Sequence, residues 1–333
     1  AGCRGPRKRG DAVTQPVVTV CVSTRNRSHL LPRLVAYLER QTLDLADFEV
    51  VIVDNGSTDD TWQVLQRLAA TSQLALRVHQ NPPGKGPAAG RNRAWRDANA
   101  PLCAFTDDDC MPSPGWLPAI VDGMADHNVV AAGRVMWPRS DEGAIGPFSR
   151  VVTAHEGSAQ WGATANLIAR RSDIEAVGGF DETFLNVAGE DTDLMWRILE
   201  RGADFRYLID AVVFHPVEPG GLMTLIRDQR RWVDIPAVFA RHPEARKALL
   251  HRGYFWRSTH PRTILAVLGL AAAPAAPLAA LLAAPWVHER TCGQPFADPW
   301  TERVVALPGT FVLDLVEVWT MVRGSIRYKT LVL

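Results

Sequence analysis

The apolar residues of the first 110 positions follow two alternating patterns, short continuous runs and runs at helical spacing. The continuous runs are rich in β-branched residues, which is typical of buried strands. They cover residues 17–22, 48–53, 75–79 and 102–106. The segments between them repeat their apolar residues every three to four positions. This alternation predicts βαβ units, and therefore a parallel sheet covered by helices on both faces.

Polar residues gather where three of these predicted strands end. They are Thr24 with Asn26, then Asp54 with its neighbours, and then the acidic run 107–109. In open α/β sheets ligands bind beyond the carboxyl ends of the strands, where the strand order reverses. The sequence therefore predicts that these three clusters contribute to one ligand site.

The pattern loosens after the acidic run. Strands are predicted at 131–135, 206–208 and 211–214, and a helix at 190–200, which Gly202 ends. After Gly220 the chain reads as mainly helical. We therefore expect a flexible basic tail at residues 1–15, an α/β domain at 16–220 and a helical region at 221–333.

Two stretches of the helical region, 263–286 and 304–322, are the most apolar of the chain. The first is rich in alanine and interrupted by two prolines, and the second contains Asp314 and Glu317, so neither is a strong membrane span. We expect peripheral attachment to a membrane surface, with aromatic residues at its edge; these are Trp286, Trp300 and Trp319. The alternative is that both stretches pack on the core or form a homodimer interface.

Charge and cysteine content exclude several classes of protein. The 36 basic residues equal the 36 acidic ones, whereas a nucleic-acid binder normally carries a basic excess. The five cysteines are widely spaced without a CxxC pair, which argues against a disulfide framework and a zinc site. Residues 1–15 have no apolar run of the signal-peptide kind. We expect a cytoplasmic protein at the inner face of the cell membrane.

The acidic run is the strongest local chemical signal. Asp107 and Asp109 would point to the same side of an extended segment and could share a divalent ion. Oxygen ligands favour Mg²⁺ or Mn²⁺, which also bind phosphate oxygens of a substrate. The alternative is a solvated acidic turn.

Two further segments could bind a nucleotide. Asp54 could accept the imide N–H of a uracil or thymine ring, or it could close the strand with an Asx-turn. Lys85, between two glycines, and Arg91 supply donors for phosphate. The segment lacks the spacing of a P-loop and of a Rossmann fingerprint.

Two residues further along are candidates for catalysis and metal binding. Asp191 could be a general base whose pKa is raised in an acidic site, or a residue that caps the following helix. His215 ends a predicted strand and could be a metal ligand, a phosphate donor or a structural histidine.

Seven segments, taken in order, resemble family 2 glycosyltransferases of the GT-A fold over residues 17–215. That resemblance implies an α/β fold with a Rossmann-like mixed sheet and helices on both faces. It also implies that Thr24 and Asp54 bind the nucleotide and that Arg91 lies in the segment lining it. We add Asn26, Lys85 and Asp108 as donor-binding candidates. The segments are VVTVCVSTRNR, FEVVIVDNGSTDDT, GPAAGRNRA, FTDDDCMPSPGWL, GATANLIARRSDIEAVGGFDETF, GEDTDLMWRILERG and AVVFH.

The same resemblance assigns the chemistry of the acidic residues. Asp107 and Asp109 match the metal-binding DxD motif, and Asp191 matches the catalytic base. The expected activity is an inverting, Mn²⁺- or Mg²⁺-dependent transfer from a nucleotide-diphosphate sugar, a UDP-sugar, to an acceptor hydroxyl. The acceptor is unidentified; a lipid-linked acceptor or a cell-envelope glycan would fit the expected location.

One departure from the family pattern limits the expected reaction. Processive members carry QxxRW, whereas this chain has RDQRRW with Asp228 at the glutamine position. Clear multiple membrane spans are also missing from the sequence. Both features favour transfer of a single sugar over polymer synthesis. The alternatives are a nucleotidyltransferase or an inactive protein that only binds nucleotide sugars.

Overall fold

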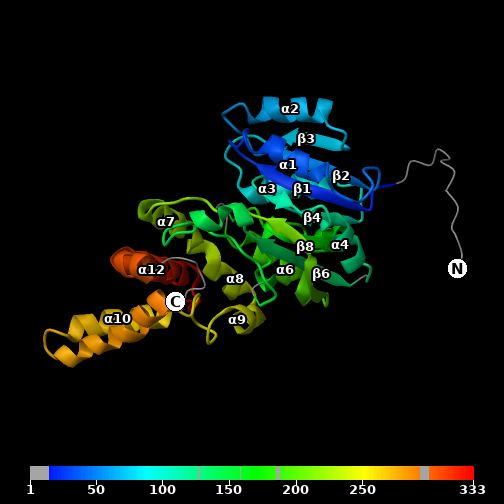
Figure 1. Ribbon diagram of the computed structural model, residues 1–333. Coiled ribbons are helices and arrows are strands. Elements are labelled where there is room, and N and C mark those ends of the chain that lie inside the picture. The colour runs from blue at the N-terminus through cyan, green and yellow to red at the C-terminus, as the bar shows by residue number, and fades with distance from the viewer. Residues whose placement is uncertain (1–14, 127, 158, 185–187, 293–299) are drawn as a thin grey trace, which may run out of the picture.

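The computed structural model describes residues 15–126, 128–157, 159–184, 188–292 and 300–333. It consists of an α/β part with one central sheet and a group of C-terminal helices at one end of that sheet (Figure 1). The predicted tail at residues 1–15 lies outside the described residues, apart from Gln15. The predicted division at residue 220 falls between the last strand and the helix that follows it, and it stays a prediction.

The sheet has eight strands in the order β3-β2-β1-β4-β7-β6-β8-β5. The first four run parallel, β7 is antiparallel to both of its neighbours, and β8 is parallel to β6. This mixed sheet confirms the expected fold class. The strands are β1 Val18–Thr24, β2 Phe48–Asp54, β3 Leu76–Gln80, β4 Leu102–Phe105, β5 Met111–Pro112, β6 Val129–Met136, β7 Leu167–Arg170 and β8 Asp204–Phe214.

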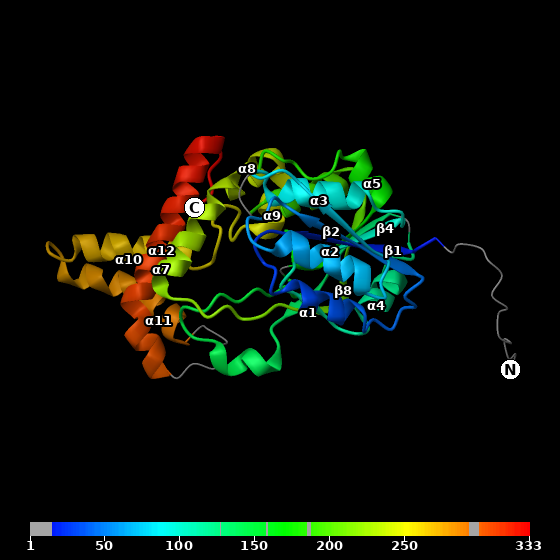
Figure 2. The same ribbon diagram turned by 90° about the horizontal axis from the view of Figure 1, so that it is seen from above.

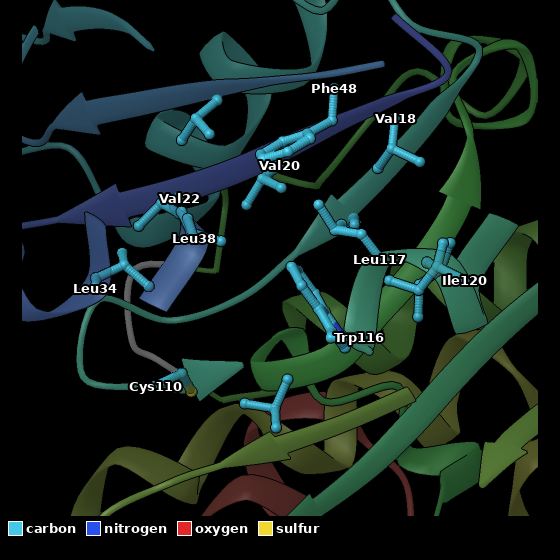
Figure 3. Packing of buried hydrophobic residues seen from close by; sticks show 14 of the residues in the cluster. Val18, Val20, Val22, Leu34, Leu38, Phe48, Cys110, Trp116, Leu117 and Ile120 are labelled. Atoms are coloured by element: carbon cyan, nitrogen blue, oxygen red, sulfur yellow. The ribbon is translucent and has the colours of Figure 1, made fainter. Parts of the chain in front are cut away.

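Side chains of the central strands alternate between two apolar layers, because successive residues of a strand point to opposite faces of the sheet. Val18, Val20 and Val22 of β1 belong to one layer, and Cys21 belongs to the other. Figure 3 shows Val20 and Phe48 of the first layer. This layer is covered by α1 Leu31–Leu38, α2 Thr61–Thr71 and α4 Trp116–Gly123. The opposite layer is covered by α3 Pro87–Arg96, α5 Arg171–Ala176 and α6 Glu190–Glu200.

The strand order reverses between β1 and β4. From β1 the chain crosses to β2 and β3 on one side, and then returns to place β4 on the other side. The carboxyl ends of β1 and β4 therefore lie next to each other at the point where open α/β sheets bind ligands. Thr24 ends β1 and the acidic run follows β4, so the sheet topology itself brings two of the predicted clusters together.

The second half of the sheet differs from the prediction. The two strands expected at 206–208 and 211–214 are one strand, β8, with a register shift opposite Gly133 and Arg134. A side chain at Gly133 would meet the Asn166 amide at 2.2 Å and the Ala211 carbonyl oxygen at 2.5 Å. Glycine is therefore required beside this bulge. The sequence analysis did not predict the strands β5 and β7, which have two and four residues.

The C-terminal helices pack around the long helix α12, Trp300–Tyr328, which contacts α7, α8 and the 3₁₀ segment Arg230–Asp234 (η4). A hairpin of α10 and the 3₁₀ segment Pro277–Ala283 (η5) projects away from the sheet (Figures 1 and 2). The remaining helices are α7 Leu222–Gln229, α8 Ile235–Arg241, α9 Pro243–Leu249, α10 His260–Ala272 and α11 Ala284–Cys292.

The two apolar stretches thus form different structures. Residues 263–286 make the hairpin, because α10 ends at Ala272 ahead of two prolines, and 304–322 lie within α12. One expectation is wrong: Trp286 does not lie at an exposed edge. It is buried, and its indole N–H donates to Asp314 at 2.7 Å. Trp300 and Trp319 are exposed as expected.

Candidate active site

Three potential metal ligands meet at the end of β4. The ligand atoms of Asp107, Asp109 and His215 all lie within 4.8 Å of one another. Asp109 and His215 are buried, whereas the side chain of Asp107 is one-third exposed. The aspartates follow β4 and the histidine follows β8, so the sheet joins residues that lie far apart in the sequence. This is the cluster that the sequence predicted.

The atoms of this cluster fit a divalent cation. The Oδ1 atom of Asp109 is buried and has no hydrogen-bond partner among the residues that the structure describes. It faces the Nε2 atom of His215 at 3.4 Å. The other ring nitrogen, Nδ1, lies 3.0 Å from the carbonyl oxygen of Pro216 and must donate to it. In a neutral imidazole Nε2 is then an acceptor, and either a cation between the two acceptors or a proton on Nε2 makes this contact favourable. Carboxylate oxygens suit Mg²⁺ and Mn²⁺.

Arg27 compensates the charge of the acidic run. Its Nη1 atom donates to Asp108 at 3.0 Å and to Asp109 at 2.6 Å. Burial raises the pKa of Asp108 to about 6, although Arg27 opposes this effect. For Asp109 the charges of His215 and Arg27 outweigh burial and lower the pKa. The sequence analysis missed Arg27, although three adjacent carboxylates in one buried turn require a nearby cation.

Asp108 and Thr24 bind each other. The Thr24 hydroxyl donates to Asp108 at 2.6 Å, and both side chains are buried. This contact joins the end of β1 to the acidic run across the reversal point of the sheet. Both residues were predicted to bind the donor. Their direct contact gives them a bracing function, and donor binding by either one stays a prediction.

Arg91 connects the metal cluster to α6. Its buried guanidinium donates to Glu190 at 2.6 Å and to Asp107 at 3.4 Å. Burial alone would lower the pKa of Arg91, but the charges of Glu190 and Asp107 outweigh it and raise the pKa. The sequence predicted Arg91 as a donor-binding residue. The structure shows that it fixes the first turn of α6 against the acidic run, and donor binding by Arg91 stays a prediction.

The side chain of Asp191, in the first turn of α6, is half-buried, and its pKa is raised far above the usual value of an aspartate. Its carboxylate accepts hydrogen bonds from the backbone N–H groups of Thr192, at 2.8 Å, and Thr164, at 3.3 Å. Burial and the neighbouring charge of Glu190 raise the pKa of Asp191 to about 7, against the opposing charge of Arg91. A carboxylate with a pKa near neutrality is suited to accept a proton at physiological pH.

The helix-capping alternative for Asp191 is not what the structure shows. The residue at the N-cap of α6 is Gly189, whose φ is +98°, and no side chain caps this end. The nearby Asp193 has the structural function instead. It binds Arg197 and His242, and these hydrogen bonds outweigh burial and lower its pKa to about 2.

The remaining donor-binding candidates lie in the loops after β2 and β3. Asp54 is fully buried; it accepts hydrogen bonds from the N–H of Ser57 at 2.9 Å and from Gln80 at 2.9 Å. Asn26 has a positive φ. Its side-chain oxygen accepts a hydrogen bond from the backbone N–H of Thr58 at 2.8 Å, which joins the loop after β1 to the loop after β2. Lys85 is exposed ahead of α3. Ser57, Thr58 and Gln80 also line a cavity of about 260 Å³.

Two glycines lie at the start of α6. Gly162, in a left-handed conformation with a φ of +64°, lies against Met195 and the backbone of Asp191. Gly189 is the N-cap residue of the helix, and it contacts Phe184 and Val238.

An acidic cluster at the reversal point of a mixed α/β sheet, connected through Arg91 to a carboxylate of raised pKa, is typical of the ligand site of an α/β enzyme. Residues 19–180 match the sequence model of the family described as "Glycosyl transferase family 2". This match covers most of the α/β part and confirms the resemblance drawn from the sequence.

Similar curated proteins carry related names. A pre-mycofactocin glycosyltransferase of Mycobacterium tuberculosis is 29% identical over 261 residues, which cover 71% of this chain and 50% of that protein. A validoxylamine A glucosyltransferase of Streptomyces hygroscopicus is 30% identical over 224 residues, covering 56% of this chain and 52% of that protein. The chain thus spans about half the length of these relatives.

Solved structures confirm the fold. A mannosyltransferase from Pyrobaculum calidifontis, solved in complex with GDP-Man and Mn²⁺, superposes with a TM-score of 0.59 at 22% identity, covering 98% of this chain and 91% of that one. Residues 1–349 of TarS from S. aureus, solved with UDP, superpose with a TM-score of 0.50 at 18% identity, covering 94% and 92%. At these identities the likeness concerns the fold alone.

Replacing Asp109 tests the metal cluster. Asp109→Asn removes a charged ligand and should weaken Mn²⁺ binding at least about tenfold, as measured by calorimetry on the full chain. Asp210→Asn, the same change at an exposed position of β8, should bind Mn²⁺ like the unchanged protein. Equal Mn²⁺ affinity in the two variants would identify the Asp109–His215 contact as an imidazolium–carboxylate ion pair instead.

Proposed function

We propose that this chain is an inverting glycosyltransferase that moves one sugar from a nucleotide-diphosphate sugar to an acceptor hydroxyl. The observation that carries the proposal is the Arg91 bridge, which holds the metal cluster and the first turn of α6 together. In this proposal Asp191 lies beside the position expected for the donor diphosphate. The family of the α/β domain supports sugar transfer as the reaction class.

The proposed mechanism uses Asp191 as the general base. Its half-buried carboxylate takes the proton of the acceptor hydroxyl, whose oxygen attacks the anomeric carbon as the bond to the diphosphate breaks. Because the acceptor oxygen attacks in a single displacement from the face opposite the leaving group, the configuration at the anomeric carbon is inverted. Asp107, Asp109 and His215 would hold Mn²⁺ or Mg²⁺, and the bound ion would neutralise the charge of the leaving diphosphate. Arg91 keeps the base and the cluster in register.

We further propose that the donor is a UDP-sugar and that its uracil ring occupies the cavity formed by the loops after β2 and β3. Asp54 lies behind Ser57 and Gln80, two residues of that cavity, and holds both by hydrogen bonds. The contact of Asp54 with Ser57 is that of an Asx-turn. It does not exclude recognition of the uracil ring, because a carboxylate has further lone pairs that can accept an imide N–H. The similar structures were solved with GDP-Man and with UDP, so the identity of the nucleobase needs a direct test.

The activity of Asp191→Asn tests the base. This variant keeps the size of the side chain but cannot accept a proton, so release of UDP from a UDP-sugar should fall about 10²-fold or more. Affinity for UDP with Mn²⁺, measured by calorimetry, should stay unchanged. In the unchanged protein the rate should fall with decreasing pH below about 7, because the base must be deprotonated. Loss of UDP affinity in the variant would make Asp191 a binding residue.

Glu190→Gln is the control for this pH dependence. It removes the like charge beside Asp191 and leaves the charge of Arg91 unopposed there, and both changes lower the pKa of Asp191. The acid limb of the rate profile should therefore move to lower pH. A limb that stays near 7 would mean that another group titrates.

Nucleotide binding tests the proposed base preference. UDP should bind more tightly than GDP, because guanine presents a different donor and acceptor edge to Asp54. Asp54→Ala should remove most of the difference. Ser57→Ala, which removes the hydroxyl contact to Asp54 but keeps the backbone contact and the carboxylate, should retain the difference. A protein that binds GDP more tightly than UDP contradicts the assignment.

We also propose that the α10–η5 hairpin attaches the protein to a lipid bilayer. Residues 263–287 contain no charged side chain, and the hairpin exposes leucines to solvent along its length. Arg262 lies near its base, where it would meet anionic headgroups. Among the described residues, one helix, α12, is long and apolar enough to span a membrane, but it carries the buried Asp314 and Glu317.

Flotation with anionic liposomes tests the attachment. Leu268, Leu278 and Leu281 are 60, 79 and 67% exposed, so replacing all three by serine should remove flotation without loss of core packing. Serine at the exposed Val305 and Ile326 of α12 is the matched control and should leave flotation unchanged. Unchanged protein that stays at the bottom but elutes as a dimer would make the hairpin a subunit interface.

A further inference from the structure

The first turn of α6, which carries Asp191, is held by a buried carboxylate on either side of that residue. Glu190 precedes Asp191 and binds Arg91. Asp193 follows it in the same turn, is 1% exposed, and binds the C-terminal end of α8. The position of Asp191 therefore depends on the contacts of Asp193 as well as on those of Glu190.

Asp193 is the centre of a network of charged groups. Its Oδ2 atom accepts a hydrogen bond from Arg197 at 2.8 Å. Its Oδ1 atom lies 3.0 Å from Nη1 of Arg241 and 3.2 Å from Nε2 of His242, the residue that joins α8 to α9. We call this set the Asp193 network, and its members are Asp181, Asp193, Arg197, Glu200, Arg241 and His242.

His242 lies between two carboxylates and has to donate to both. Its Nδ1 atom is 2.8 Å from a carboxylate oxygen of Glu200, at the other end of α6, while Nε2 faces Asp193. The histidine is 3% exposed, so water does not take the place of either partner. A carboxylate only accepts hydrogen bonds, and an imidazole that donates from both nitrogens is positively charged.

The charges of the Asp193 network balance when His242 is protonated. Hydrogen bonding to His242 and the charge of Arg197 outweigh burial and lower the pKa of Asp193 to about 2, so this carboxylate is ionised at neutral pH. Asp181 binds Arg241 at 2.7 Å. Three carboxylates thus face two guanidinium groups, and the imidazolium supplies the third positive charge.

The protonation of His242 responds mainly to Asp193 and Glu200. Burial alone would lower the pKa of His242, but the hydrogen bonds with these two carboxylates outweigh it and raise the pKa. The contact therefore stabilises the fold below the usual histidine pKa of about 6.5, and it is lost as the pH rises through the raised pKa. Further charged groups around α8 have partners of their own, namely Glu244 with Lys247, Arg246 with Thr330, and Arg327 and Tyr328 with Asp234.

We propose that His242 is a positioning residue for Asp191, and that its two ring hydrogen bonds hold α6 in the orientation that proton transfer requires. This inference rests on the proposed glycosyl transfer with Asp191 as the base. His242 acts through Asp193. When it loses a proton, a lone pair of the ring faces a carboxylate, the contact becomes repulsive, and the first turn of α6 is no longer held from this side.

Titration of His242 by NMR tests its protonation without relying on catalysis. In the full chain labelled with ¹⁵N-histidine, the signal that is missing from His242→Gln identifies the residue. Its titration midpoint should lie above about 6.5, the usual value for histidine, with both ring nitrogens protonated below the midpoint.

The rate of UDP release from a panel of UDP-hexoses, measured against pH, tests the connection to Asp191. The rate should fall on the alkaline side with the midpoint of the His242 titration. Glu200→Gln keeps an oxygen that accepts from Nδ1 but removes the charge, so both midpoints should move to lower pH together. Glu200 ends α6, roughly 13 Å along the helix from Asp191, and so does not touch the base. Glu175→Gln, the same change at an exposed position of α5, should leave both midpoints unchanged.

His242→Gln separates positioning from donor binding. Glutamine donates to one carboxylate at any pH and does not titrate, so the alkaline limb should disappear and the maximal rate should fall about tenfold. Affinity for UDP with Mn²⁺ should stay unchanged, because no member of the Asp193 network belongs to the metal cluster or lines the cavity near Asp54. Loss of that affinity would show general damage to the domain and contradict the positioning role.

Hydrogen exchange follows the first turn of α6 directly. The backbone N–H of Asp193 donates to the carbonyl oxygen of Gly189 at 2.9 Å. At a pH between the His242 midpoints of Glu200→Gln and of the unchanged protein, the amides of residues 193–196 should exchange faster in the variant. This comparison needs no turnover, so it also decides the inference in a protein without measurable transfer.

The proposal is wrong if His242 titrates at or below the usual value, or if the alkaline limb stays in place while Glu200→Gln moves the His242 titration. Equal exchange of the first turn in the two proteins also contradicts it. Absence of UDP release from every UDP-hexose, together with the expected titration and exchange, would instead count against the proposed glycosyl transfer.

Discussion

The buried guanidinium of Arg91 is the interaction on which the candidate site depends. It comes from α3 and binds one carboxylate at the end of β4 and another at the start of α6. Neither Arg91 nor Glu190 could be buried at low cost without the other, because an isolated charge in a protein interior is strongly unfavourable. The pair therefore specifies how α6 docks on the sheet, and with it the position and pKa of Asp191.

Much of the fold is readable from the sequence because its signals are local. The runs at 17–22, 48–53 and 102–106 are continuous and β-branched, and they form strands that lie in the middle of the sheet. The topology of such a sheet then places the residues after each strand at a common edge, so Asp107 and Asp109 could be assigned to one ligand site from the sequence alone. His215 follows β8, and the bulge opposite Gly133 sets the register with which that strand reaches the same edge.

The features that the sequence did not reveal are pairwise contacts between distant segments. Arg27 was missed because its partners lie some 80 residues away, and no pattern in the sequence joins them. Trp286 was taken for a surface residue because it ends an apolar run, whereas its partner Asp314 stands in another apolar stretch and draws the indole inward. A polar residue within an apolar helix is a sign of such a partner, but its identity depends on the packing.

The two ends of the chain make different contributions to the proposed chemistry. The family match covers residues 19–180, which hold the acidic run, Arg91 and the cavity near Asp54, and in the proposed mechanism these residues concern the donor. The helices α10, α11 and α12 lie outside that match, and α10 forms the apolar hairpin with η5. The proposed membrane attachment therefore depends on segments that follow the matched region, and on the packing of α10 against α12.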